Sequence, residues 1–187
     1  MTQSAVDVAN SALQKIGAAS ITSLTDGSAE ARAVSIAYDS NRRDELRRYP
    51  WNFSIKRAVL APDVETPTFG YDYQFTLPAD CLRVMRCADA TIDWQIEGRK
   101  ILTNGGDTLY LRYQSDVTDE AQWDSNFYNV FAVSLAIDIC DKLTQSNTKK
   151  QALQKEYNES IAFAKRSDSI EFGPIDAQDD YWWLVRL

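Results

Sequence analysis

The chain begins with apolar residues that recur at intervals of three and four, which is the spacing of one face of an α-helix. The residues of this stripe are Val6, Ala9, Leu13 and Ile16. Ser4 and Asp7 are spaced like the two members of a capping box, although Glu or Gln is the usual second member. Gly17 is placed to end this first helix.

A second helix is predicted over residues 28–49, with Asp26 or Ser28 as its N-cap and Pro50 ending it. Its apolar face is thin and consists of Ala33, Ile36, Ala37 and Leu46. Its second half interrupts four arginines with acidic residues; the arginines are Arg42, Arg43, Arg47 and Arg48. We interpret this half first as a solvated face, because arginine suits the C-terminal end of a helix dipole. The alternative is an interface with another subunit, where arginine is enriched.

Between residues 51 and 116 the apolar period changes from that of a helix to two, which is typical of strands. The alternation is clearest in WNFSIKRAVLA, YDYQFTLP, CLRVMRCAD and TLYLRYQSD. Gly98-Arg99 joins two further short runs, and Asn104-Gly105 is a strong signal for a hairpin turn. We expect five or six short antiparallel strands that form a small sandwich or a partly closed barrel.

Helical periodicity returns after the strands. Residues 127–143 are apolar almost all round, which predicts a central, buried helix. A last helix, with Asn147 as its cap, follows a short link and forms an antiparallel hairpin with it. The apolar stripe of this last helix is Leu153, Tyr157, Ile161 and Ala164. Periodicity is lost after Arg166, and Gly173-Pro174 marks a break.

The order of these elements predicts an α+β fold in which a helical bundle is interrupted by a small antiparallel β domain. Residues 1–50 and 117–168 supply the bundle, as two N-terminal helices and a C-terminal helical hairpin. Residues 51–116 form the β domain, and residues 169–187 form an extended C-terminal arm.

The arm ends in DDYWWLVRL, a concentration of apolar side chains that is unusual at a chain terminus. Leaving them exposed promotes aggregation, and Trp and Tyr dominate binding hot spots. Either this segment folds back onto its own domain or another protein receives it. We expect the second, with the anchors Tyr181, Trp182, Trp183, Leu184 and Leu187. The acidic residues that keep the arm soluble before docking are Asp176, Asp179 and Asp180.

The composition limits the chemistry that the chain can perform. It contains no histidine, which excludes Ser-His-Asp and Cys-His catalysis and HExxH zinc sites. Its net charge of -7 makes it a poor binder of nucleic acid, although DNA can pass along an acidic wall. Three cysteines without CxxC spacing favour buried thiols over disulfides or zinc. We expect no signal peptide and no membrane segment.

Acidic residues are the remaining candidates for catalysis or metal binding. Asp138 and Asp141 lie on the most apolar helix, where we interpret them as its wetter edge. The residues that could ligate calcium lack EF-hand spacing; they are Asp116, Asp119 and Glu120. Phosphate-binding glycine motifs are absent from the sequence. We therefore predict no catalytic, cofactor-binding or metal-binding residues, with a carboxylate-dependent hydrolase as the enzymatic alternative.

Three segments, in this order, resemble the tail tubular protein A family of short-tailed bacteriophages: RRYPWNF at 47–53, LPADCLRV at 77–84 and EGRKILTN at 97–104. Together with the N-terminal helices, the resemblance extends over nearly the whole chain. It implies a head-to-tail adaptor in which a helical bundle is interrupted by a β domain. It also implies a dodecameric ring between the portal protein and the tail nozzle protein, which prolongs the DNA channel, and a C-terminal segment that docks on the portal.

Under this resemblance we expect a structural protein of the virion tail, assembled in the host cytoplasm and free of cofactors. A monomer in isolation is compatible with this role, and genomic DNA is expected to pass without sequence-specific binding. The alternatives are a head-completion connector of another phage type, a tail-associated cell-wall hydrolase and an ordinary cytoplasmic interaction domain.

Overall fold

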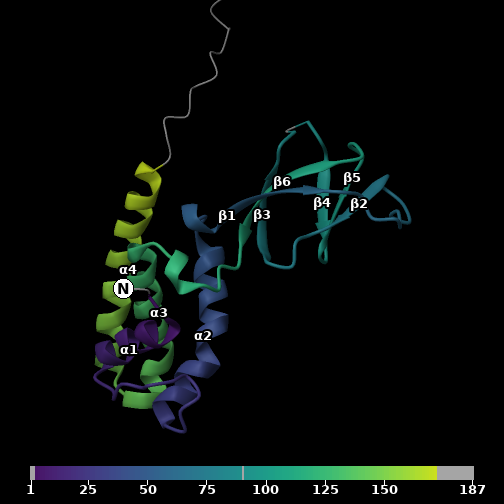
Figure 1. The fold of residues 1–187 in the computed structure, drawn as a ribbon. Coiled ribbons are helices and arrows are strands. Elements are labelled where there is room, and N and C mark those ends of the chain that lie inside the picture. Colours follow the sequence, from purple (N-terminus) through teal and green to yellow (C-terminus); the bar gives the residue numbers. More distant parts are fainter. Residues whose placement is uncertain (1–2, 90, 172–187) are drawn as a thin grey trace, which may run out of the picture.

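The computed structural model describes residues 3–89 and 91–171 and consists of a helical part and a β part (Figure 1). The four helices are α1 (Ala5–Ile16), α2 (Ala29–Arg48), α3 (Ser125–Thr144) and α4 (Asn147–Ile170). The six strands are β1 (Ile55–Leu60), β2 (Tyr73–Thr76), β3 (Cys81–Cys87), β4 (Trp94–Glu97), β5 (Lys100–Thr103) and β6 (Leu109–Ser115). This α+β architecture, with the strands inserted between α2 and α3, confirms the predicted fold class.

The helix ends follow local sequence chemistry. Ser4 and Asp7 form the predicted capping box, and Gly17 ends α1 with a φ of 73°, a left-handed conformation that glycine adopts without strain. Of the two candidate caps of α2, the structure uses Ser28, whose hydroxyl accepts from the backbone N–H of Ala31 at 3.1 Å. The cap of α4 is Ser146 and not Asn147, so that prediction was wrong by one residue.

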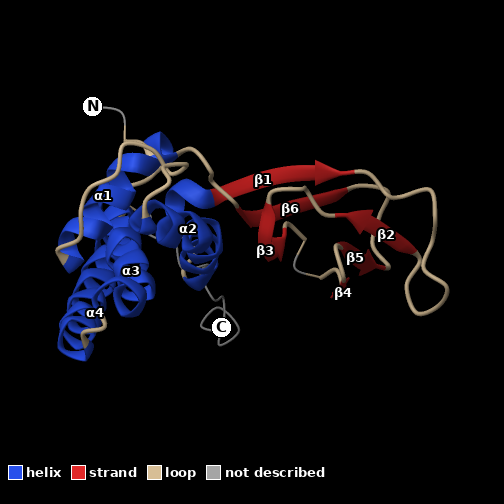
Figure 2. Ribbon diagram, turned by 90° about the horizontal axis from the view of Figure 1, so that it is seen from below, coloured by secondary structure: helices blue, strands red, loops and turns tan. Residues whose placement is uncertain are grey.

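The predicted central helix is confirmed, because α3 packs against α1, α2 and α4 (Figure 2). Its Phe127 and Phe131 rings are both fully buried and stack with a centroid separation of 6.2 Å. Further aromatic rings pack edge-on or tilted against these two; they are Tyr38, Trp51, Phe53 and Trp123. Aromatic pairs in such geometries add to the stabilisation from burial alone. This cluster is the centre of the helical core.

The strands form two antiparallel three-stranded sheets with the orders β1-β6-β3 and β2-β5-β4. Their inner faces share a second apolar core, to which Phe75 and Ile101 come from one sheet and Leu109 and Leu111 from the other. Two packed sheets of this kind agree with the expected small sandwich.

Three details of the sequence prediction were wrong. Asn104-Gly105 does not close a hairpin, because β5 and β6 belong to different sheets and the segment crosses between them. The strand predicted from Trp51 begins only at Ile55, after a 3₁₀ turn, and Trp51 is buried in the helical core. Ile36, expected on the apolar face of α2, is 74% exposed.

The C-terminal helix also extends further than the periodicity indicated. Helix α4 continues to Ile170, although apolar periodicity is lost after Arg166, because Asp168 still faces the body and makes polar contacts there. Within residues 3–89 and 91–171, every helix is too short or too polar to cross a lipid bilayer.

Replacing Phe127 with alanine tests the helical core. We expect Phe127→Ala to lower the free energy of unfolding by about 3–5 kcal/mol, because the removed ring leaves a cavity amid four aromatic side chains. The matched control is Phe163→Ala on α4, whose side chain is 63% exposed, with an expected change within about 0.5 kcal/mol. Urea unfolding monitored by circular dichroism measures both, and equal losses would contradict this assignment of the core.

Candidate functional site

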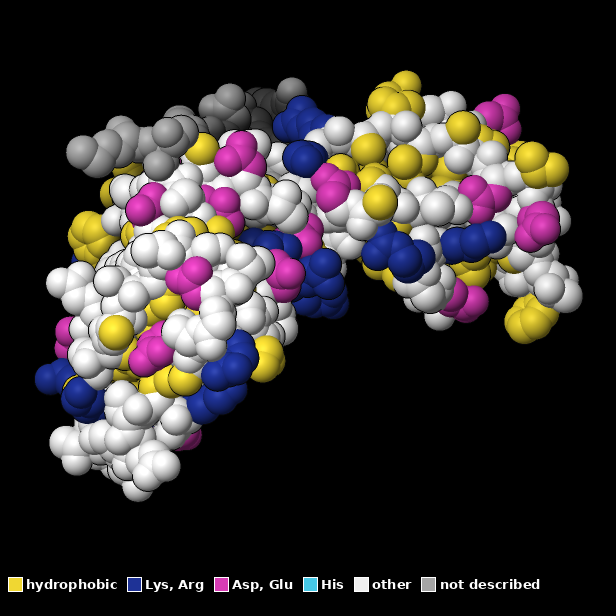
Figure 3. Space-filling view, turned by 60° about the horizontal axis from the view of Figure 1, so that its bottom comes forward, with side chains coloured by type: hydrophobic (Ala, Val, Ile, Leu, Met, Phe, Trp, Pro, Cys, Tyr) yellow, Lys and Arg dark blue, Asp and Glu magenta, His cyan; other side chains and the backbone are white. Residues whose placement is uncertain are grey.

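The helical part and the β part meet at the C-terminal end of α2, where the chain passes into β1 and where β6 returns toward α3. Figure 3 shows the molecule bent at this place, with Lys and Arg side chains gathered where the two parts join. We call this region the junction and define it by residues 38–54, 114–123 and 168. Polar contacts concentrate here and determine how the two parts are placed.

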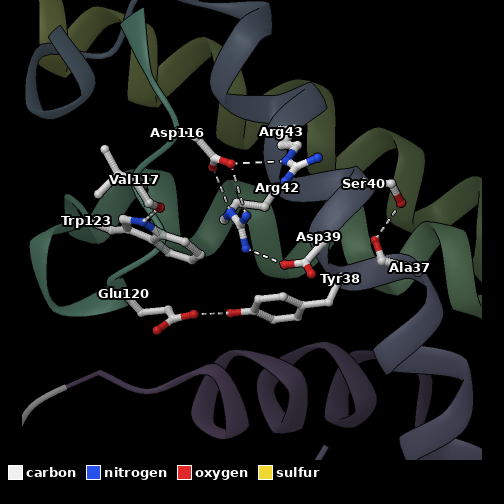
Figure 4. A network of polar contacts seen from close by, with 10 residues as sticks. All are labelled: Ala37, Tyr38, Asp39, Ser40, Arg42, Arg43, Asp116, Val117, Glu120 and Trp123. Carbon is white, nitrogen blue, oxygen red and sulfur yellow. Dashed lines mark hydrogen bonds and ion pairs between the residues drawn. The ribbon is translucent and has the colours of Figure 1, made fainter. Parts of the chain in front are cut away.

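Asp116, the first residue after β6, is the centre of the junction (Figure 4). Its carboxylate accepts from Nε of Arg42 at 3.0 Å and from Nε of Arg43 at 3.0 Å. Nη1 of Arg42 donates to the exposed Asp39 at 2.5 Å. Burial by itself lowers the pKa of the Arg42 guanidinium, but the hydrogen bonds and charges of Asp116 and Asp39 outweigh this and raise it. A buried, permanently charged arginine is therefore fully engaged between α2 and the end of β6.

The return segment from β6 to α3 is held by two further side chains. The Tyr38 hydroxyl donates to Glu120 at 2.9 Å, and burial together with the Glu120 charge raises the pKa of Tyr38 above its ordinary value. The indole N–H of Trp123 donates to the carbonyl of Val117 at 3.0 Å, which closes the segment on itself (Figure 4). This connection is consequently ordered by the same helix that receives Asp116.

The C-terminal carbonyl groups of α2 receive donors from the β part. The last carbonyls of a helix have no partner within the helix. The amide of the buried Gln114 donates to the carbonyls of Leu46 and of Tyr49, the latter at 2.6 Å. In the opposite direction, Nη1 of Arg47 donates to the carbonyl of Leu82 in β3 at 2.5 Å. Strands β3 and β6 are thus hydrogen-bonded directly to the end of α2.

A buried carboxylate connects α2 with α3 and α4. Glu45 is 1% exposed and accepts from the Ser134 hydroxyl at 2.7 Å and from the Tyr157 hydroxyl at 2.8 Å. Arg48 donates to Tyr157 at 2.7 Å and lies 3.5 Å from Glu45. Burial, followed by the Glu45 charge, raises the pKa of Tyr157 and keeps its phenol a donor. This cluster fixes the end of α2 to the helical hairpin.

The start of the β part is tied to the end of α4. The backbone N–H of Asn52 donates to the Asp168 carboxylate at 3.0 Å, and the Asn52 amide donates to the Asp168 carbonyl at 2.8 Å. Burial raises the pKa of the Asp168 carboxyl, and the charges of Glu171 and Asp124 raise it further. One buried Asp168 oxygen has no partner among the described residues.

The structure places the four arginines of the second helix in the junction, each in a different setting. Arg42 is 5% exposed, so the solvated face predicted for this half of the helix does not include it, because Asp116 makes its burial favourable. Arg47 contacts β3 and Arg48 contacts α4, while Arg43 binds Asp116 with most of its side chain exposed. Tyr181, Trp182, Trp183, Leu184 and Leu187 lie outside the described residues, as does nearly all of the predicted arm.

The candidate acids of the sequence have ordinary structural partners. Asp138 accepts from the Asn41 amide at 2.8 Å, and Asp141 pairs with Lys150. Asp119 caps the 3₁₀ turn Glu120–Gln122. Within the part of the chain that the structure describes, the acids and thiols form no group of three or more that could hold a metal ion. The contacts of the junction can therefore orient the two parts of the protein relative to each other.

Sequence analysis did not identify three residues that together form the junction: Gln114, Asp116 and Glu45. Asp116 and Arg42 are separated by 74 positions, and Glu45 and Tyr157 by 112. A polar residue within an alternating strand, such as Gln114, carries no signal that it will be buried. Only the packing of the β part against α2 reveals these partners.

Replacing Asp116 with alanine tests the central ion pair. We expect Asp116→Ala to lower the free energy of unfolding by about 3 kcal/mol, because Arg42 loses its buried counter-charge. Asp39→Ala is the control, since this carboxylate is 73% exposed and its loss is expected to cost less than about 1 kcal/mol. Urea denaturation of the two variants is the measurement, and a small effect at Asp116 would remove it from the centre of the junction.

Replacing Asp168 with asparagine tests the raised carboxyl pKa. Above this pKa the folded chain carries a buried charge that the unfolded chain exposes to water, so ionisation of Asp168 destabilises the fold. We expect Asp168→Asn to raise the melting temperature at pH 7, because the amide oxygen still accepts from Asn52 without the charge. The gain should shrink as the pH falls toward 4 and wild-type Asp168 takes up its proton. The measurement is the melting temperature of wild type and variant between pH 4 and pH 7, with Asp138→Asn as the control. A difference between wild type and Asp168→Asn that does not change with pH would contradict the prediction.

Comparison with known proteins identifies a family that shares most of this chain. The family model described as "Tail tubular protein" matches residues 6–122, which include α1 except its first residue, α2, all six strands and the junction residue Asp116. No curated protein matches the chain. Because the matched segment exceeds half of the 187 residues and includes both parts of the fold, the protein belongs to the tail tubular protein family and is a structural component of a bacteriophage tail.

Proposed function

We propose that the protein is the head-to-tail adaptor of a short-tailed bacteriophage. In this role its copies form a ring, expected to be dodecameric, between the portal protein and the tail nozzle protein. The ring prolongs the channel through which genomic DNA passes. A monomer in isolation is compatible with this role. The chain is expected to assemble in the host cytoplasm and to join the virion at the neck of the tail.

The observation that carries this proposal is the family match, which spans the first two helices and the complete β part. The junction supports it physically. A ring subunit must present two different patches to its two neighbours at a constant angle, because only a repeated head-to-tail contact closes a ring. Buried, directional contacts at Asp116 and Gln114 hold the two parts at such an angle.

The arginines of α2 remain our candidates for a subunit interface, with their roles now divided. Arg42 is engaged within the chain, so it supports an interface by positioning and not by contact. Arg43 and Arg48 each expose more than half of their side chains at the junction. Each neighbouring copy carries a net negative charge, because every chain has 27 acidic and 20 basic residues. A basic edge against an acidic neighbour therefore favours association.

Family membership suggests a structural role and no catalysis. DNA is expected to pass without sequence-specific binding, because a net charge of -7 disfavours contact with phosphates. No cofactor, metal or membrane takes part in the proposed function.

The C-terminal arm is the proposed portal anchor, through Tyr181, Trp182, Trp183, Leu184 and Leu187. We expect deletion of residues 176–187 to leave a folded chain with a cooperative unfolding transition, because other residues form the helical and β cores. The truncated chain should fail to assemble on purified portal rings. Electron microscopy of the mixtures counts the copies per ring, and Phe163→Ala, on the exposed face of α4, is the control that should still assemble.

Two outcomes would contradict the proposal. Assembly of the truncated chain on the portal would remove the anchor role from the arm. Failure of the full-length chain to form rings on any portal preparation would remove the adaptor role itself. Loss of the unfolding transition on truncation would instead show that the arm belongs to the core.

A further inference from the structure

Three arginines form a row across the β1-β6-β3 sheet (strands labelled in Figure 1). Arg57 of β1 and Arg86 of β3 are both direct register partners of Arg112 in the middle strand β6. Partners in an antiparallel pair project to the same face. Leu111 and Ala58, one position away, pack in the β core, so the arginines occupy the outer face.

The arginine row lacks counter-charges. Among the described residues, none accepts a hydrogen bond from the guanidinium group of Arg57, Arg86 or Arg112, and none forms an ion pair with it. Nε of Arg112 is buried without a partner. Like charges directly opposite one another destabilise a sheet, and an unsatisfied buried donor costs more. Such a row in a chain of net charge -7 indicates a surface that receives carboxylates.

The row is bordered by apolar side chains. Val59 and Tyr110 are register partners at the next outer position and are 63% and 57% exposed. With the arginines and Ala88 they line a hollow of about 430 Å³. A phosphate backbone would use the guanidinium groups and leave this apolar border wet. A peptide that carries both carboxylates and large apolar side chains would use both.

We propose that this outer sheet face is the docking surface for residues 172–187 of the same chain in the free subunit. That segment contains three acidic residues followed by large apolar ones: Asp176, Asp179, Asp180, Tyr181, Trp182, Trp183 and Leu184. The carboxylates would pair with the arginine row, and the aromatic residues would cover Val59 and Tyr110.

The position where the described chain ends makes this occupant the favoured one. Asn52 binds Asp168, and its side-chain amide donates to the Glu171 carboxylate at 3.2 Å. Glu171, the last described residue, therefore lies beside Asn52, which precedes the first residue of β1 by three positions. Asp176 follows Glu171 by five residues, and Arg57 follows Asn52 by five. Both stretches reach about 17 Å when extended. A tethered segment also has an effective concentration in the millimolar range, which favours it over a second copy.

The inference goes beyond the proposed function and survives without it. Where both hold, the sheet and the portal compete for the same tryptophans, and docking on the sheet would keep the apolar anchors covered until the portal displaces them.

Disulfide trapping in the full-length chain tests the docking. We expect a Val59→Cys, Leu184→Cys double variant to form an intramolecular cross-link under mild oxidation, at least about tenfold faster than a Val64→Cys, Leu184→Cys control. Val64 is fully exposed on the same part of the protein and is not among the residues that line the hollow. The native cysteines are all buried, and burial raises the thiol pKa of Cys81 and Cys87, so they oxidise slowly. Peptide mass spectrometry identifies the linked pair.

Charge reversal shows whether the arginine row is responsible. Arg57→Glu with Arg86→Glu should reduce the cross-linking rate to that of the control, and adding Asp179→Arg with Asp180→Arg should restore it. The arginine substitutions should not lower the melting temperature, because each places an opposite charge beside Arg112. Three results would overturn the proposal: a cross-link only between copies in mixtures of the single-cysteine variants, a rate equal to the Val64 control, or a rate insensitive to charge reversal.

Discussion

The buried ion pair between Arg42 and Asp116 is the contact on which the arrangement of this protein depends. The β part is an insertion, so the chain crosses between the two parts twice, before β1 and after β6. An insertion joined by two chain crossings can pivot about them unless each crossing is held. Asp116 holds the second crossing against α2, and Asn52, bound to Asp168, holds the first against α4. Without these contacts the same helices and sheets could exist with no defined angle between them.

The choice of polar over apolar residues at the junction has a physical reason. Apolar burial is non-directional and permits sliding, whereas a hydrogen bond weakens steeply with angle. Gln114, which caps the carbonyls of Leu46 and Tyr49, and the Glu45 cluster therefore specify one orientation. Ion pairs of this kind add little net stability compared with well-packed apolar residues. Their value to a tail protein lies in a defined geometry that every copy shares.

The sequence predicted the helices, the two caps of α1 and the division into helices and strands, because these depend on neighbours within a few positions. Ser4 with Asp7, Gly17 and the central helix are examples. Predictions failed where a partner lies far along the chain. Trp51 alternates like a strand residue, yet its indole reaches Phe127, and Asn104-Gly105 has hairpin chemistry but lies between two sheets. The junction could not be found from the sequence, since the four arginines are indistinguishable until Asp116 and Leu82 are placed beside three of them. The C-terminal anchors lie outside the described residues and stay a prediction.

The pairing of Ile55 with Gln114 has a consequence for how such proteins diversify. The first residue of the inserted module and one of its last are direct neighbours, about 5 Å apart across a strand pair. The two ends of the β part are therefore close together, so the helical bundle carries it as a single loop between α2 and α3. The entropic penalty of closing a loop grows only with the logarithm of its length. Descendants of one ancestral gene could enlarge, shrink or exchange this module while the helices kept their packing, provided that a carboxylate stayed at its exit.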